Sequence, residues 1–132
     1  MGMALLNIPT IKDVRGKLAV IEKECIPFDF KRVYYLFDVP SDSTRGGHAH
    51  IAQSEFLIAL SGSFDVILKD GNKQSKVTLN KPDKGLLIEK GIWRELENFS
   101  AGSVCLVLAS DHFQESDYIR EYPEFLAFKN RD

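Results

Sequence analysis

Short apolar and β-branched stretches alternate with turn sequences along most of the chain. They recur at intervals of about 8–12 residues, a spacing that is typical of β-sandwiches and barrels. The pair Asp70 and Gly71 strongly favours a tight hairpin turn. Only residues 115–129 have helix-like spacing, and Pro123 interrupts it. The pattern therefore predicts an antiparallel β-fold with strands at residues 17–22, 32–38, 55–60, 63–69, 74–79, 85–89 and 103–110.

Two of these strands differ in how their apolar residues are distributed. In residues 63–69, Phe64, Val66 and Leu68 alternate with a more polar set, which predicts one buried face and one mostly solvated face. Residues 104–108 are apolar at every position, so that strand should be covered on both faces, inside a closed barrel or across a subunit interface. A small jelly roll with paired subunits accounts for both patterns.

Composition limits the class of protein. With 132 residues and 44% hydrophobic content, the chain is long enough for one domain over residues 1–132. The net charge of -2 gives no reason to expect a nucleic-acid or membrane partner. We see no apolar run of membrane-spanning length and no secretion signal. Cys25 and Cys105 form no CxxC pair, which favours free thiols in a reducing compartment. A cytoplasmic protein is the resulting expectation.

Two histidines one residue apart, His48 and His50, are the most informative local feature. On an extended strand, residues i and i+2 point to the same face, so the two imidazoles should lie side by side. Such a pair serves as metal ligands or as an acid/base pair, and two hydrogen-bonded structural histidines are the simpler alternative.

The spacing from His48 and His50 through Glu55 to Gly62 resembles the first motif of the cupin superfamily, whose small jelly-roll barrels hold a ligand or a metal in their mouth. The glycine that normally precedes the first histidine by six residues is replaced by Asp42. In metal-binding cupins a second motif supplies another histidine. The matching region here is residues 85–98, where Arg94 fills the histidine position and Asn98 matches the motif's asparagine.

Arg94 weakens the case for a metal. A guanidinium is always charged, cannot coordinate a cation and repels a divalent ion in the same cavity. His48, His50 and Glu55 could form a three-ligand site with an open position, but we predict no metal and no cofactor. The third histidine, His112, lies in a loop and is expected at the surface.

The neighbours of the histidine pair favour proton transfer and ligand binding. Arg45 and two glycines precede the pair, and Tyr35 lies in a neighbouring aromatic strand. Arg32, Arg15 and Lys17 lie on strands or turns that a jelly roll could bring to the same mouth. A cationic, aromatic cavity of this kind suits a phosphorylated ligand that carries a flat ring.

The chain is similar to the sugar 3,4-ketoisomerases of the WxcM-like cupin family from about Ile11 to Phe125. The runs that carry this resemblance are residues 31–38 (KRVYYLFD), 45–50 (RGGHAH), 56–71 (FLIALSGSFDVILKDG) and 107–122 (VLASDHFQESDYIREY). The resemblance implies an enzyme that acts on dTDP-4-keto-6-deoxyglucose, in pathways to 3-amino-3,6-dideoxy sugars of bacterial surface glycans. It also implies a metal-independent homodimer that exchanges an N-terminal strand. Many members carry Trp-His where this chain has Trp93 and Arg94.

Moving a ketone from C4 to C3 requires removal of the C3 proton, formation of an enediol and reprotonation at C4. We predict that His48 and His50 together perform this proton transfer, and we favour His50 as the carbon base. Tyr35 would bond a sugar oxygen or relay protons between oxygens. Arg45 would hold the sugar or polarise an oxyanion, and Arg32 would contact the pyrophosphate.

Five other residues are assigned more loosely to substrate binding. Trp93 would close over the ligand or serve as a core residue at the rim of the barrel. Arg15 and Lys17 would reach the site of a neighbouring subunit or be solvated. Glu55 and Arg94 complete the predicted set.

Two alternative functions remain open at this point. A nucleotide-sugar 3,5-epimerase would use similar acid/base groups on the same substrate, and a non-catalytic cupin would sense a ligand. The configuration of the product at C4, galacto or gluco, does not follow from the sequence.

Overall fold

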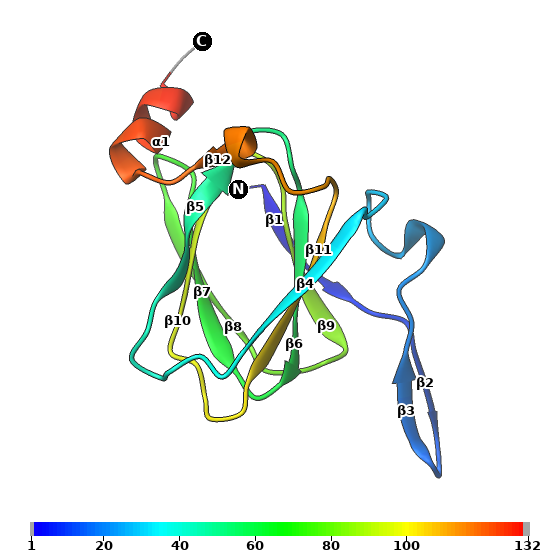
Figure 1. Ribbon diagram of the computed structural model, residues 1–132. Helices are drawn as coiled ribbons and strands as arrows, with labels where there is room; N and C mark the ends of the chain where they lie inside the picture. The colour runs from blue at the N-terminus through cyan, green and yellow to red at the C-terminus, as the bar shows by residue number, and fades with distance from the viewer. Residues whose placement is uncertain (1, 131–132) are drawn as a thin grey trace.

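A computed structural model describes residues 2–130. Two five-stranded antiparallel sheets face each other, and the predicted jelly-roll architecture is confirmed (Figure 1). The first sheet contains, in spatial order, β1 (Met3–Asn7), β9 (Lys84–Ile88), β6 (Glu55–Ser61), β11 (Val104–Ala109) and β4 (Arg32–Phe37). The second contains β12 (Tyr118–Ile119), β5 (Arg45–His50), β10 (Trp93–Glu97), β7 (Phe64–Lys69) and β8 (Gln74–Leu79).

The remaining elements lie outside the two sheets. They are the hairpin β2 (Thr10–Asp13) and β3 (Gly16–Ala19), the 3-10 turns η1 (Lys23–Cys25) and η2 (Glu115–Asp117), and the helix α1 (Tyr122–Lys129). The hairpin projects away from the barrel, and all of its strand residues are exposed (Figure 1). No helix in the described part of the chain is long and apolar enough to cross a bilayer.

The main core fills the space between the two sheets. Phe64, Val66 and Leu68 of β7 are buried there, as their alternation predicted. The opposite face of β7 is less solvated than predicted, because Asp65 and Ile67 are also buried. Asp65 tolerates burial since it accepts hydrogen bonds from Thr78 and Asn98.

The uniformly apolar strand β11 is covered on both faces, as predicted. Cys105 and Val107 belong to the core between the sheets. Leu108 belongs to a second cluster together with Ile8 and Ile26. The outer cover is thus provided by the N-terminal segment of the same chain.

Helix α1 packs against the outer face of the second sheet, where Ala49, Trp93 and Phe125 form a third apolar cluster. Pro123 lies in the first turn of this helix and does not interrupt it, since a first-turn residue needs no intrahelical N–H donor. Because Ala49 points outward to α1, its neighbours His48 and His50 point inward between the sheets.

Gly62, the last position of the cupin-like motif, makes the tight connection between β6 and β7 possible. Its φ angle of 69° lies in the left-handed region, and a Cβ atom there would collide with Ser100 and Ser103. The motif spacing therefore reflects a backbone requirement at this position.

Candidate active site

A cavity of about 300 Å³ opens between the two sheets. Its wall is contributed by β4, β5, β6, β10 and β11 and by the segment that follows η2. Its lining residues are Arg32, Tyr34, Leu36, Arg45, Gly46, His48, Glu55, Leu57, Arg94, Leu96, Val107, Tyr118 and Arg120. Four arginines and one carboxylate make this lining strongly cationic.

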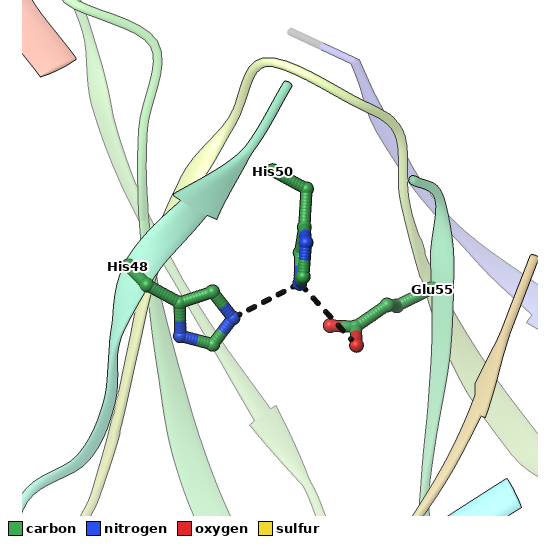
Figure 2. Close-up of side chains that lie close together, drawn as sticks. All are labelled: His48, His50 and Glu55. Carbon is green, nitrogen blue, oxygen red and sulfur yellow. Dashed lines mark hydrogen bonds and ion pairs between the residues drawn. The ribbon is translucent and has the colours of Figure 1, made fainter. Parts of the chain in front are cut away.

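His48 and His50 lie side by side, as the strand periodicity predicted. Their Nε2 atoms are 3.1 Å apart, with the rings nearly perpendicular (Figure 2). His48 lines the cavity, whereas His50 lies behind it with no exposed surface. Burial, together with the positive charge of Arg94, lowers the pKa of His48 to about 3. His48 is therefore a neutral proton acceptor at physiological pH.

Glu55 connects the groups around the histidines. Its Oε1 accepts a hydrogen bond of 2.5 Å from Arg94, and its Oε2 accepts one of 2.8 Å from the Tyr34 hydroxyl. Oε2 also lies 3.5 Å from Nε2 of His50 (Figure 2). Burial alone would raise the pKa of Glu55, but the contact with His50 and the charge of Arg94 lower it to about 2. A carboxylate that remains ionised inside the barrel is thereby stabilised.

Arg94 and Tyr34 are held in place by this carboxylate. A second nitrogen of Arg94 donates to the carbonyl of Ile92 at 3.1 Å, so the guanidinium is fixed from two sides. Burial and the negative charge of Glu55 raise the pKa of Tyr34 above its usual range. Tyr34 therefore keeps its proton, which it donates to Glu55.

The two histidines and Glu55 offer ligand atoms within 4.8 Å of one another, the arrangement expected of a metal site. The surroundings do not fit a cation. Both oxygens of Glu55 are already engaged, by Arg94 and by Tyr34. A divalent ion at this point would face the guanidinium and displace it from its only acidic partner among the described residues.

Six predicted site residues meet at this cavity: His48, Arg32, Arg45, Glu55 and Arg94 in its wall, and His50 directly behind. Near the opening, Arg32 reaches Gln53 and the hydroxyl of Tyr118, at 3.4 Å each. His112 is exposed, as predicted.

The structure does not bring Tyr35 to the cavity. Strand alternation places it on the outer face of β4, with 60% of its surface exposed. Tyr34 occupies the inward position instead. The same alternation could have revealed this, because Arg32 and Tyr34 differ by two positions and must share a face.

Trp93, Arg15 and Lys17 also lie outside the cavity. Trp93 is a core residue that packs against Tyr122 and Phe125, and its indole N–H donates to Glu95. Arg15 and Lys17 lie on the exposed β2–β3 hairpin, where Arg15 pairs with Asp13 of the same turn.

Sequence reasoning missed three site residues on the segment after β11: Asp117, Tyr118 and Arg120. The Tyr118 ring lies 5.0 Å from the ring of His48 and 4.5 Å from that of His50. Arg120 stacks on Tyr118 at 4.2 Å and pairs with Glu115. No periodic pattern marks these residues; they lie within residues 107–122, one of the runs that carried the family resemblance.

Comparison with known proteins places the chain in a family. Residues 1–130 match the family described as WxcM-like, C-terminal. The chain is 45% identical over 126 residues to the TDP-4-oxo-6-deoxy-alpha-D-glucose-3,4-oxoisomerase of Aneurinibacillus thermoaerophilus, covering 95% of this chain and 91% of that protein.

Solved structures agree with this match. A 3,4-ketoisomerase from Helicobacter canadensis superimposes with a TM-score of 0.97 at 44% identity, covering 99% of both chains. A second structure is a histidine-to-asparagine mutant of the 3,4-ketoisomerase QdtA from Thermoanaerobacterium thermosaccharolyticum in complex with TDP-4-keto-6-deoxyglucose. It superimposes with a TM-score of 0.94 at 41% identity, covering 97% of this chain and 94% of that one. An epimerase from Mycobacterium tuberculosis shares the fold alone, with 15% identity and a TM-score of 0.78, covering 95% of this chain and 72% of that one. The chain therefore belongs to the WxcM-like family.

Proposed function

We propose that the protein is a sugar-nucleotide 3,4-ketoisomerase that converts TDP-4-keto-6-deoxyglucose, the dTDP-linked sugar, into its 3-keto isomer. The observation that carries the proposal is the neutral His48 facing an arginine-rich cavity. The relatives named as 3,4-ketoisomerases support it, because they match nearly the whole length of the chain.

We assign the removal of the C3 proton to His48. The sequence-based hypothesis favoured His50, but His50 has no exposed surface from which to reach a substrate. The adjacent C4 carbonyl acidifies the C3–H bond, and a neutral imidazole is the base that this step requires. As the C3–H bond breaks, its electrons form the C3–C4 double bond of an enediol, and reprotonation at C4 leaves the ketone at C3.

Tyr34 takes the oxygen-side role that was predicted for Tyr35. Its hydroxyl is protonated, lines the cavity and is oriented by Glu55. It is therefore suited to turn its proton from Glu55 to the carbonyl oxygen at C4 and to take up the proton that the C3 hydroxyl loses, so that Tyr34 ends the step protonated. No redox partner is needed, because the oxidation of C3 and the reduction of C4 balance within the sugar.

The arginines at the opening are assigned to the diphosphate. Arg32, Arg45 and Arg120 line the cavity without being buried, and guanidinium groups bind phosphate oxygens in a bidentate manner. Arg94 differs from them because it is fully buried, where two of its nitrogens donate to Glu55 and to the Ile92 carbonyl. We assign Arg94 to holding Glu55 in place at the floor of the site.

A homodimer is the second part of the proposal. The outer side of the edge strand β4 exposes Val33, Tyr35 and Phe37 by 51%, 60% and 60%. Within one chain β1 pairs with β9, so the N-terminal element that projects freely is the β2–β3 hairpin. We propose that this hairpin crosses to a partner and brings Arg15 and Lys17 near its cavity. Light scattering should give twice the mass of one chain, and a monomeric mass would contradict this assembly.

The proposed product indicates which type of enzyme acts next, and the cysteines indicate the compartment. A 3-keto sugar is the substrate of a transamination at C3, so we expect an aminotransferase to consume the product, as in the synthesis of 3-amino-3,6-dideoxy sugars. Cys25 and Cys105 are free thiols, which supports a reducing compartment such as the cytoplasm.

The decisive test separates isomerase, epimerase and sensor. The purified protein is incubated with TDP-4-keto-6-deoxyglucose in D₂O that contains EDTA, beside a sample without protein. The proposal predicts loss of the C3 hydrogen and retention of the hydrogen at C5 relative to that sample. Protein-dependent exchange at C5 would indicate a 3,5-epimerase, and binding without any exchange would indicate a sensor.

A further inference from the structure

We propose that Asp117 is a positioning residue that fixes the proton of His50 on Nδ1 and so allows His50 to take up and return the proton that His48 removes. This inference rests on the proposed isomerase reaction. It adds a third member, from a distant part of the chain, to the pair of histidines.

Asp117 is held rigidly beside His50. It ends η2 immediately before β12, whose Tyr118 is the register partner of His50 on β5. Its Oδ1 accepts a hydrogen bond of 2.7 Å from the backbone N–H of Ala52. Its Oδ2 lies 2.9 Å from Nδ1 of His50 and 3.3 Å from the backbone N–H of Gln53. The carboxylate thus has no freedom to turn away from the imidazole.

This contact determines the tautomer of His50. A carboxylate can only accept, so Nδ1 of His50 must carry a hydrogen. With a single hydrogen on the ring, the Nε2 atom of His50 is then an acceptor, and the nearest group to it, at 3.1 Å, is Nε2 of His48. His48 must therefore carry its own hydrogen on Nε2, which leaves Nδ1 as its basic atom. Among residues 2–130, that Nδ1 atom makes no hydrogen bond.

The charges around the two rings differ in a way that favours transfer from His48 to His50. His48 faces the guanidinium of Arg94, which disfavours an imidazolium there. His50 lies between two carboxylates, with Asp117 at 2.9 Å from Nδ1 and Glu55 at 3.5 Å from Nε2. A proton that moves from His48 to His50 therefore leaves the vicinity of a guanidinium and arrives between two carboxylates.

The proton balance is simple. Nδ1 of His48 takes the proton from C3 while its Nε2 proton moves to Nε2 of His50. His50 becomes an imidazolium that donates to Asp117 and to His48, and His48 is again neutral with its new proton on Nδ1. The reverse movement delivers a proton to C4 and restores both rings.

The test uses Asp117→Asn, which removes the negative charge that holds the hydrogen of His50 on Nδ1. In either orientation the asparagine NH₂ group meets a donor, the N–H of Gln53 beside His50 or the N–H of Ala52, so at least one contact of the carboxylate is lost. We expect kcat to fall by about two orders of magnitude, the scale of an acid/base effect, with KM and TDP affinity within about two-fold and an altered pH profile of kcat. Asp111→Asn is the matched control, since Asp111 bonds Ser110 on the same segment. Its kcat should equal that of the wild type.

Ring-nitrogen NMR makes the proposal independent of any variant's folding. The chain has 3 histidines, so long-range ¹H–¹⁵N correlations can be assigned from His48→Asn and His112→Asn. The wild type should show an Nδ1–H tautomer for His50. An Nε2–H tautomer in the wild type, or full activity of Asp117→Asn, would overturn the proposal. If the wild type does not isomerise the sugar, the proposed function fails, whereas the tautomer is still read directly.

Discussion

Arg94 on β10 and His48 on β5 are direct register partners, and both side chains enter the same cavity. One is permanently cationic, and the other is kept neutral by burial and by that cation. The same guanidinium satisfies the buried carboxylate of Glu55. A single side chain therefore disfavours a metal, retains an ionised carboxylate and preserves a base, and each of these effects can be measured.

Replacing His48 by Asn should remove the carbon base. We expect kcat to fall by about two to four orders of magnitude, because general base catalysis contributes on that scale. TDP binding, measured by calorimetry, should change by less than about two-fold, since the arginines at the opening are untouched. His112→Asn serves as the control because His112 is exposed. A His48→Asn enzyme with wild-type kcat would remove His48 from the mechanism.

The two adjacent tyrosines of β4 provide a matched pair of variants. Tyr34→Phe deletes the hydroxyl that Glu55 orients in the cavity, and we expect kcat to fall by about two orders of magnitude. Tyr35→Phe deletes an outward-facing hydroxyl, and its kcat should stay within two-fold of the wild type. Steady-state rates of both variants decide the assignment. The opposite ranking would return the oxygen-side role to Tyr35.

Stability should decrease on mild acidification because of His48. Its pKa is about 3 in the folded chain, against an ordinary value of 6.5. Between these values the unfolded chain binds more protons, so stability rises with pH and is lost as the pH falls below about 6.5. From pH 7 to pH 5 this single group should lower the free energy of unfolding by about 2 kcal/mol.

Urea unfolding at pH 7 and pH 5 measures this loss. His48→Asn should show a smaller loss than the wild type, because it lacks the titrating ring. Glu55 acts in the same direction further into acid: with a pKa of about 2 instead of 4.5, its contribution is lost as the pH falls below about 4.5. An identical loss in the wild type and in His48→Asn would refute the predicted neutrality of His48.

Replacing one partner of the buried Arg94–Glu55 pair should destabilise the folded protein. Arg94→Met leaves the buried Glu55 carboxylate without its nearest cation and with only Arg32, 3.9 Å away, beside it. We expect a destabilisation of about 3–5 kcal/mol in urea unfolding. Adding Glu55→Gln removes the orphaned charge and should restore most of the loss. A double variant as unstable as Arg94→Met would mean that packing, and not charge, explains the effect.

Much of the fold was predictable because its strands follow local apolar patterns. Residues 74–79 coincide with β8, and the alternation in residues 63–69 placed the core face of β7 correctly. The strand β10 was missed because it contains Arg94, Glu95 and Glu97, charges that no local pattern marks as strand-forming. Their partners, such as Glu55 for Arg94, lie far away in the sequence.

The site was predictable in part for the same reason. The i, i+2 rule placed His48 and His50 together, since that relation is local. Asp117 could not be predicted because it is separated from His50 by 67 positions and meets it only through the pairing of β12 with β5. Which histidine faces the cavity likewise depends on the depth of each ring in the barrel, which no pattern on one strand encodes.

The central claim concerns the position of the ketone, and carbon NMR tests it most directly. The wild-type protein is incubated with TDP-4-keto-6-deoxyglucose that is labelled with ¹³C at C4. The account predicts that the labelled carbon moves from the carbonyl to the alcohol region of the spectrum, as C3 becomes the carbonyl. A labelled C4 that remains a carbonyl after prolonged incubation with folded, TDP-binding protein would contradict it.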